Sequence, residues 1–398
     1  MKTGRPHLDE DGPIGLRISR RSAVPAFIVM DVMEAAAARE AQGHNVLHME
    51  VGQPGTSAPR AALDAVKRAL DRETLGYTVA LGLPALRARI AGHYRQRYGI
   101  EVAPERIVVT TGSSAGFVLA FLALFEPGDR VAMASPGYPP YRHILSALGC
   151  EPVLIETTEA TRWALTPDAL MAAHREKPLK GVLIASPANP TGTMMTPAAL
   201  RALIETANEE GLCFISDEIY HGLDYSFAAE TAARLSESAV IINSFSKYFC
   251  MTGWRIGWMV LPQPLVRAVD RLQGNLAISV PTLSQISAEA AFDGRAEMDA
   301  VKHGYQQNRR ILLEGLPKAG FEKILPVDGA FYLYADVSRF CDDSFEFAQR
   351  MLSETHVATT PGVDFDPRRG RKFIRFCYAG SSAEMDEAVE RIGAWLQP

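Results

Sequence analysis

Between residues 106 and 260 the chain alternates short apolar runs with segments of helical pattern, and this alternation limits its possible folds more than any other feature. Several runs are apolar at successive positions, which is typical of strands covered on both faces. The helical segment 196–210 has Thr196 as its N-cap and Pro197 at the first helical position. The apolar runs are 106–110, 130–134, 152–156, 181–185, 212–216, 239–244 and 256–260. The pattern predicts an α/β fold with an open, mostly parallel sheet.

The rest of the chain has a looser pattern, with longer helices and fewer strands. The expected helices and strands outside the alternating region are 26–42, 281–293, 295–314 and 381–396 (helices) and 46–50, 330–335 and 372–377 (strands). A length of 398 residues is enough for two or three domains. We therefore predict a large α/β domain of residues 51–280 and a small α+β domain built from residues 1–50 and 281–398.

The charge balance excludes several classes of partner. The chain has 41 Lys and Arg against 46 Asp and Glu, a net charge of −5, so no global attraction draws it to nucleic acid or to an anionic membrane. The longest apolar runs, such as 117–125, have about half the length of a membrane span. The N-terminal residues lack the apolar core of a secretory signal. We expect neither a nucleic-acid nor a membrane partner.

The cysteines indicate a reducing compartment. They stand far apart, without a CxxC pair, at Cys150, Cys213, Cys250, Cys341 and Cys377. An odd number of scattered cysteines is typical of reduced, intracellular proteins and not of a disulfide framework. We expect a cytoplasmic protein without a bound metal.

Chemically useful residues follow the predicted strands. In open α/β sheets, ligands bind at the carboxyl ends of the strands. The groups found there are the loop Thr111-Gly112-Ser113-Ser114, the ring of Tyr138, the amide of Asn189, the carboxylate of Asp217 with Tyr220, and the amine of Lys247. Together they suit a cofactor that carries a phosphate, an aromatic ring and a carbonyl group.

Lys247 is the most informative of these residues. It lies within SFSKYFCMTGWRIGW (residues 244–258), among aromatic residues, Met and Gly. Most lysines are solvated surface residues, but this setting is a poor one for a surface lysine. A lysine that loses its proton can form a Schiff base with a carbonyl, and nearby cations such as Arg255 encourage that loss.

The other strand-end residues each have a plainer interpretation. The hydroxyls of Ser113 and Ser114 fit either an ordinary helix start or a phosphate site, because free N–H groups and the helix dipole favour an anion there. Asp217 ends an apolar strand and is either the first residue of a loop or a half-buried carboxylate that needs a cationic partner, such as a pyridinium N–H. Asn189, between two prolines, is also a common turn former.

The order and spacing of these segments resemble the class I and II aminotransferases, pyridoxal 5′-phosphate enzymes of fold type I. The resemblance extends from the Gly52-Gln53-Pro54 turn to the strand that holds Arg375. Its most specific parts are residues 244–257, with Lys247, together with Asn189-Pro190-Thr191-Gly192 and Asp217-Glu218-Ile219-Tyr220. It implies a mostly parallel seven-stranded sheet sandwiched by helices, with a smaller α+β domain from both termini. Cys250 stands where the family usually has Gly, Ala or Ser, and we expect this difference to affect packing only.

The resemblance also implies a role for each matching residue. Lys247 would form the Schiff base and move the proton, Asp217 would pair with the pyridinium nitrogen, and Arg375 would bind the substrate carboxylate beside Gly52. The cofactor would be held by Asn189 and Tyr220 at its phenolate oxygen, by Tyr138 at its ring, and by Ser113, Ser114, Ser244 and Arg255 at its phosphate. Tyr77 would reach the phosphate of a neighbouring subunit, which implies a homodimer.

The resemblance implies transfer of an amino group from an L-amino acid to a 2-oxo acid by a ping-pong mechanism, without naming the amino acid. A carbon–sulfur β-lyase or an enzyme similar to aminocyclopropane-carboxylate synthase would share the same cofactor residues. A regulator that uses this fold as a sensor would need a DNA-binding module, and the 50 residues before the large domain are too few for one and lack a basic cluster.

Overall fold

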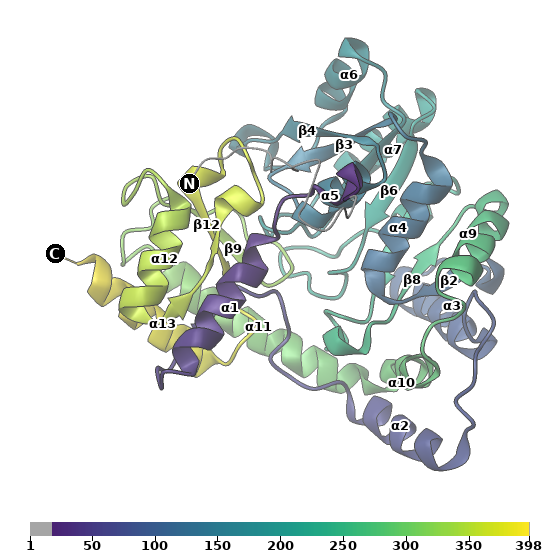
Figure 1. The fold of residues 1–398 in the computed structure, drawn as a ribbon, viewed down its shortest axis with the longest axis horizontal. Helices are drawn as coiled ribbons and strands as arrows, with labels where there is room; N and C mark the ends of the chain where they lie inside the picture. The colour runs from purple at the N-terminus through teal and green to yellow at the C-terminus, as the bar shows by residue number, and fades with distance from the viewer. Residues whose placement is uncertain (1–17, 398) are drawn as a thin grey trace.

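The computed structural model describes residues 18–397 of the chain. The first 17 residues, to which the expectation about a secretory signal refers, and residue 398 lie outside the described part. Figure 1 shows a large sheet flanked by helices beside a smaller group of strands and helices that contains the C-terminal segment and α1. Within the described range, no helix combines the length and the apolar character needed to cross a lipid bilayer.

The predicted α/β sheet is confirmed, and it has seven strands in the order β2-β8-β7-β6-β5-β3-β4. Their bounds are β2 (Ile107–Thr110), β3 (Arg130–Ser135), β4 (Glu151–Glu156), β5 (Gly181–Ala185), β6 (Cys213–Asp217), β7 (Val240–Ser244) and β8 (Gly257–Val260). The pairs β7–β6, β6–β5, β5–β3 and β3–β4 are parallel, whereas β8 runs antiparallel to both β2 and β7. The predicted strand positions agree with the observed ones to within one residue at each end.

Helices cover both faces of this sheet, which explains why its strands are apolar at successive positions. On one face, α4 (Gly112–Leu124) and α9 (Gln263–Leu276) pack in a cluster with alternate strand residues such as Val131 and Met133. On the other face, α3 (Pro84–Tyr98) and α7 (Pro197–Glu209) pack against the residues between them, such as Ala132. The edge strand β4 is partly exposed because it has a neighbour on one side only.

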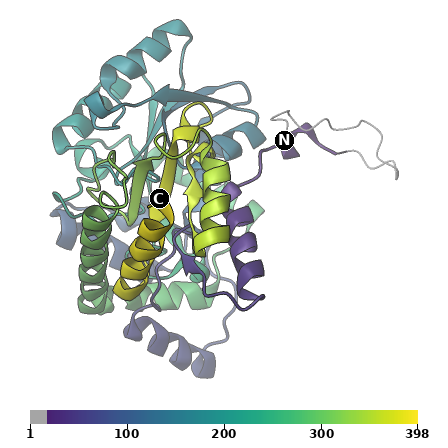
Figure 2. The same ribbon diagram turned by 90° about the vertical axis from the view of Figure 1, so that its left-hand side faces the viewer.

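A second, three-stranded antiparallel sheet lies beside the first. It has the order β11-β12-β9, with β11 at Thr360–Pro361, β12 at Phe373–Cys377 and β9 at Tyr332–Asp336. A short parallel pair joins β1 (Leu47–His48) to β10 (Val357–Ala358), so the N-terminal segment packs with the C-terminal one. Figure 2 shows the helices of this region side by side: α11 (Arg295–Gly315), α13 (Ser382–Leu396), α12 (Ser344–Thr355) and α1 (Ile28–Glu40).

The chain passes between the two groups through α10 and α11. Helix α10 (Thr282–Ala291) packs against α2 (Arg60–Arg72) and α3, and α11 then runs alongside α13. The division into domains of residues 51–280 on one side and 1–50 with 281–398 on the other stays a prediction.

Gly192 joins the loop after β5 to the second sheet. Its carbonyl oxygen accepts hydrogen bonds from the N–H groups of Asp328 and Gly329, both at 2.9 Å. Its φ is +68°, a conformation that favours glycine, and an added Cβ would lie 2.6 Å from the carbonyl oxygen of Tyr332 at the start of β9. The loop and the strand can approach this closely only because residue 192 has no side chain.

We predict that Gly192→Ala destabilises the protein more than Gly211→Ala. Gly211, between α7 and β6, has nearly the same φ (+66°), but an added Cβ there would have no atom within 4 Å. Gly211→Ala should therefore lower the free energy of unfolding by about 1 kcal/mol through backbone strain alone. Gly192→Ala should cost about 2–4 kcal/mol because it also moves the backbone of β9. Urea unfolding of both variants measures the difference, and equal losses would contradict the close approach at Gly192.

Candidate active site

A cavity of about 180 Å³ lies where the carboxyl ends of the parallel strands face β9, β12 and the start of α1. Most of the predicted site residues line it: Gly52, Ser113, Ser114, Tyr138, Asn189, Asp217, Tyr220, Lys247, Arg255 and Arg375. These residues come from segments that are up to about 320 residues apart in the chain, so the fold brings together what the sequence separates.

Two predicted residues lie outside the cavity lining. The Ser244 side chain is buried at the end of β7, where its Oγ lies 2.9 Å from Ser246 Oγ, and it is Ser246 that lines the cavity. Tyr77, in the loop between α2 and α3, is 84% exposed. The role predicted for it at a neighbouring subunit's phosphate would need a second chain.

Lys247 follows β7 and points its amine into the cavity. Its Nζ donates a hydrogen bond to the carbonyl oxygen of Gly52 at 2.6 Å. Burial lowers the pKa of Lys247 to about 8, and the positive charges of Arg375 and Arg255 contribute in the same direction. An amine with this pKa loses its proton readily near neutral pH, which makes it a nucleophile and a base.

Asp217 is the last residue of β6 and presents a buried carboxylate to the cavity. Its Oδ1 accepts a hydrogen bond from the N–H of Ile219 at 3.0 Å, and its Oδ2 accepts one from the hydroxyl of Tyr141. Burial raises the pKa of Asp217 to about 6, and these hydrogen bonds, together with the charge of Lys247, oppose the rise. The carboxylate is thus ionised at neutral pH and available to a cationic N–H group.

The start of α4 carries groups that could bind an anion. Ser113, Ser114 and Ser246 place hydroxyl groups on the cavity wall beside the guanidinium of Arg255. Gly112, the first residue of α4, has a φ of +76°, and an added Cβ would lie 2.5 Å from Arg255 Nη2. The missing side chain lets the guanidinium approach the helix start, where free N–H groups and the helix dipole also favour an anion.

Arg375, on β12, is buried and held from several sides. Its Nη1 donates to Asn189 Oδ1 at 2.8 Å, and its Nη2 donates to Thr360 Oγ1 at 3.1 Å and to the carbonyl oxygen of Glu50. Among the described residues its Nε has no hydrogen-bond partner, although it is buried. A buried N–H without a hydrogen-bond acceptor is energetically costly. A carboxylate in the cavity would accept the hydrogen bond of this Nε–H.

The structure adds residues that sequence reasoning missed. Tyr141 and Tyr332 line the cavity, and each bonds to a predicted site residue, Asp217 and Tyr220 respectively. Apolar side chains from the start of α1, and from the residues just before α1 and before Gly52, also line it: Phe27, Val29, Met30 and Val51. Aromatic and aliphatic residues are common in any core, so the sequence carried no signal that could have identified them.

Cys250 adopts a left-handed conformation, with φ at +56°. Glycine is favoured in that conformation, so Cys250 carries backbone strain that a glycine there would not. The side chain is buried, and Thr56 Oγ1 donates a hydrogen bond to its Sγ at 3.2 Å. Cys250 therefore packs between the loop after Lys247 and the segment that follows Gly52.

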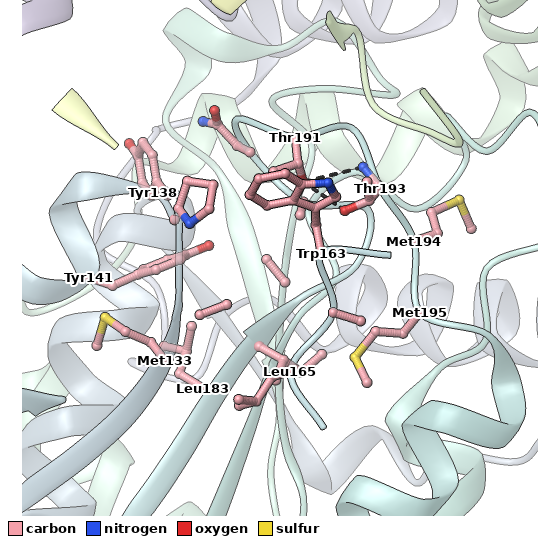
Figure 3. Close-up of a pocket in the computed structure, with 18 residues that line it drawn as sticks. Met133, Tyr138, Tyr141, Trp163, Leu165, Leu183, Thr191, Thr193, Met194 and Met195 are labelled. Atoms are coloured by element: carbon pink, nitrogen blue, oxygen red, sulfur yellow. Dashed lines mark hydrogen bonds between the residues drawn. The ribbon is translucent and has the colours of Figure 1, made fainter. Parts of the chain in front are cut away.

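A smaller apolar cavity adjoins the first one behind Tyr138 and Tyr141 (Figure 3). It has a volume of about 40 Å³ and is walled by Met133, Leu183, Trp163 and other apolar residues. That volume holds only a few water molecules, so it is too small to bind an organic ligand.

We predict that Lys247 reacts with amine reagents with an apparent pKa of about 8, well below the ordinary lysine value of 10.5. Below pH 8 most of its amine is protonated and unreactive, and above pH 8 most of it is free. Competitive acylation of the cofactor-free protein at several pH values, followed by peptide mapping, measures this midpoint. Lys67, whose side chain is 66% exposed, is the internal control. The same midpoint at both lysines would contradict the effect of burial.

Comparisons with known proteins agree with this geometry. The family model "Aminotransferase class I and II" matches residues 44–392. The chain is 50% identical to valine–pyruvate aminotransferase of Mycobacterium tuberculosis over 96% of this chain and 98% of the relative. It is 32% identical to aspartate aminotransferase of Geobacillus stearothermophilus over 96% and 99% of the two chains. The solved structure of aspartate aminotransferase from Thermus thermophilus with maleate superposes with a TM-score of 0.90 at 30% identity, over 95% of this chain and 99% of the other. The chain belongs to the class I and II aminotransferases.

Proposed function

We propose that this aminotransferase holds pyridoxal 5′-phosphate in the cavity at the sheet edge. The proposal is carried by one observation: a half-buried amine, a buried carboxylate and a helix start with hydroxyls and a guanidinium line the same cavity. When bound, the cofactor supplies an aldehyde that condenses with amines and a protonated ring that withdraws electrons from the carbon bearing the amino group. The amino group passes from an L-amino acid to a 2-oxo acid in two half-reactions at the same site.

The residues of the cavity fit each part of that group. Ser113, Ser114 and Arg255 would bind the phosphate, with Ser246 lining the same wall and Ser244 supporting Ser246. Asp217 would accept the hydrogen bond of the ring nitrogen and hold its proton there, because an ionised carboxylate stabilises the charged form. Gly112 supports this assignment, since a side chain at that position would fill the space between the helix start and the guanidinium.

The remaining cavity residues would orient the ring and move the proton. Tyr138 would stack on the ring, and Asn189 and Tyr220 would donate hydrogen bonds to the phenolate oxygen. Lys247 Nζ would bind the aldehyde carbon in the resting enzyme and, once displaced by the substrate, would take the proton from the substrate Cα and return it at the neighbouring carbon. Its lowered pKa supports this double role, because both protonation states are accessible near neutral pH.

The substrate is an amino acid with a small apolar side chain. Arg375 would bind its α-carboxylate through the unpaired Nε, beside Gly52 and Asn189. The cations of the cavity, Lys247, Arg255 and Arg375, are then all engaged, and the wall formed by Phe27, Val29 and Met30 offers only apolar surface. The name of the valine–pyruvate aminotransferase relative agrees with this selectivity and supports pyruvate as an acceptor.

The exposed apolar surface around Tyr77 supports a homodimer. Val79, Leu276 and Ile278, from the same loop and the end of α9, are 58%, 60% and 51% exposed. The two segments are linked by a hydrogen bond from the N–H of Thr78 to Ser279 Oγ at 3.3 Å. Several large apolar side chains gathered on one surface are typical of an interface, and a partner there would let Tyr77 reach the partner's phosphate site.

A cytoplasmic location is proposed from the cysteines, all five of which are free.

We expect the purified protein loaded with pyridoxal phosphate to convert L-valine and pyruvate into alanine and the 2-oxo acid of valine, with little activity on L-aspartate. Borohydride reduction followed by peptide mapping should find the cofactor on Lys247. Lys247→Ala should retain cofactor through its phosphate but lose transamination by many orders of magnitude. Release of ammonia and pyruvate from a β-substituted amino acid without amino transfer would instead identify a lyase, and a label on another lysine would reject the assignment of Lys247.

Hybrid dimers test the proposed role of Tyr77. Tyr77→Phe should weaken cofactor binding by about 1.5–3 kcal/mol, because it removes a hydrogen bond to a charged phosphate. Mixed with the inactive Lys247→Ala chain, it should form dimers in which one site combines an intact lysine with an intact tyrosine from the partner. That site should hold the cofactor as tightly as the unmodified enzyme. A monomer in solution, or mixed dimers no better than Tyr77→Phe alone, would reject the shared site.

A further inference from the structure

Tyr332 occupies a position that connects two parts of the cavity. It is the first residue of β9, is 1% exposed and lines the cavity. In the antiparallel pairing of β9 with β12, Tyr332 lies opposite Cys377 and Tyr334 lies opposite Arg375. Tyr332 and Arg375 are therefore diagonal neighbours on the same face of the sheet, close enough for a ring and a long side chain to meet.

The ring of Tyr332 forms one side of the Arg375 site. The guanidinium carbon lies 4.4 Å from the centroid of the Tyr332 ring and 4.7 Å from that of Phe365. A guanidinium over aromatic rings is attracted to them, and the attraction strengthens when water is excluded. Arg375 is 3% exposed, so the two rings help to fix the plane in which its free Nε points.

The hydroxyl of Tyr332 reaches a second part of the cavity, which contains Tyr220 and Gly52. Its Oη lies 2.8 Å from Tyr220 Oη, and both oxygens are buried. An added Cβ on Gly52 would lie 1.7 Å from the Tyr332 hydroxyl, so only glycine leaves the space it occupies. The carbonyl oxygen of the same glycine accepts the hydrogen bond of Lys247. The hydroxyl thus lies between the backbone that holds Lys247 and the side chain of Tyr220.

We propose that Tyr332 is a positioning residue that acts on both the substrate arginine and Tyr220. Its ring orients Arg375 for the substrate carboxylate, and its hydroxyl donates a hydrogen bond to Tyr220 Oη. A tyrosine has one hydroxyl proton, so when Tyr220 donates into the cavity, the proton between the two oxygens must come from Tyr332. Burial raises the pKa of both tyrosines, which keeps both protons in place at neutral pH. The inference rests on the proposed function, in which Tyr220 donates to the phenolate oxygen of the cofactor.

Removal of the hydroxyl alone tests the link to Tyr220. In the holoenzyme without substrate, the visible absorbance of the lysine-bound cofactor is titrated against pH. Tyr332→Phe should raise the pKa of this absorbance change by about 0.5–1 unit, because a less well-oriented Tyr220 stabilises the deprotonated cofactor less. The KM values for amino acids should stay within about twofold, because the ring remains over Arg375.

Tyr334→Phe is the matched control for that titration. Tyr334 lies on the same face of the same strand, and its buried hydroxyl has no hydrogen-bond partner among the described residues. Loss of this hydroxyl should leave the absorbance titration unchanged. A titration of Tyr332→Phe that coincides with those of the unmodified enzyme and Tyr334→Phe would overturn the link to Tyr220.

Removal of the ring tests the link to Arg375. Tyr332→Leu should raise KM for every amino acid tried by about 5- to 30-fold, with a smaller change in kcat, in addition to the shift seen for Tyr332→Phe. An unchanged KM would overturn this part of the proposal. If the leucine variant does not fold, Tyr332→His replaces it, because histidine keeps a planar ring but changes its charge distribution over Arg375. Its KM values are judged in the same way: an increase supports the role of the ring, and unchanged values overturn it. An unmodified enzyme that shows no lysine-bound absorbance at all would instead reject the proposed function.

Discussion

The parallel alignment of β5, β6 and β7 is the constraint on which the site depends. Parallel strands end at the same edge of a sheet, so the residues that follow them meet there whatever their distance in the chain. Asn189, Asp217 and Lys247 each follow or end one of these strands. Strand β8 is antiparallel to β7, so it begins at the edge where the parallel strands end. Arg255 lies just before β8 and therefore reaches the same edge. One backbone arrangement therefore positions the amide, the carboxylate and both cations.

Burial gives these groups their chemistry. A charged side chain removed from water must find partners or change its protonation state. Lys247 and Asp217 respond in opposite directions, with pKa values of about 8 and about 6, because burial disfavours the charged form of each. The hydrogen bonds from the hydroxyl of Tyr141 and the N–H of Ile219 limit the rise in the pKa of Asp217. The amine can thus gain and lose a proton near neutral pH while the carboxylate stays charged.

The second sheet completes the cavity instead of merely covering it. Arg375 comes from β12 but donates to Asn189 in the loop after β5, and Gly192 holds the same loop against the start of β9. Through these contacts, the guanidinium of Arg375 keeps a fixed position relative to the groups at the strand ends. The close packing around Tyr332 depends on two glycines, Gly52 and Gly192, because a Cβ at either position would overlap atoms of Tyr332.

The sequence by itself determined the seven strands, their mostly parallel arrangement and the residues at their carboxyl ends. The pattern of apolar residues and the position of each strand end are local properties of the chain. It also pointed to Arg375 through the resemblance to the family. It did not reveal that Ser246 and not Ser244 lines the cavity, or that Tyr141, Tyr332 and the apolar residues at the start of α1 do so. Those choices depend on which side chains face each other across β9, β12 and the large sheet. Such contacts are set by the packing of elements far apart in the chain, and only the tertiary structure decides them.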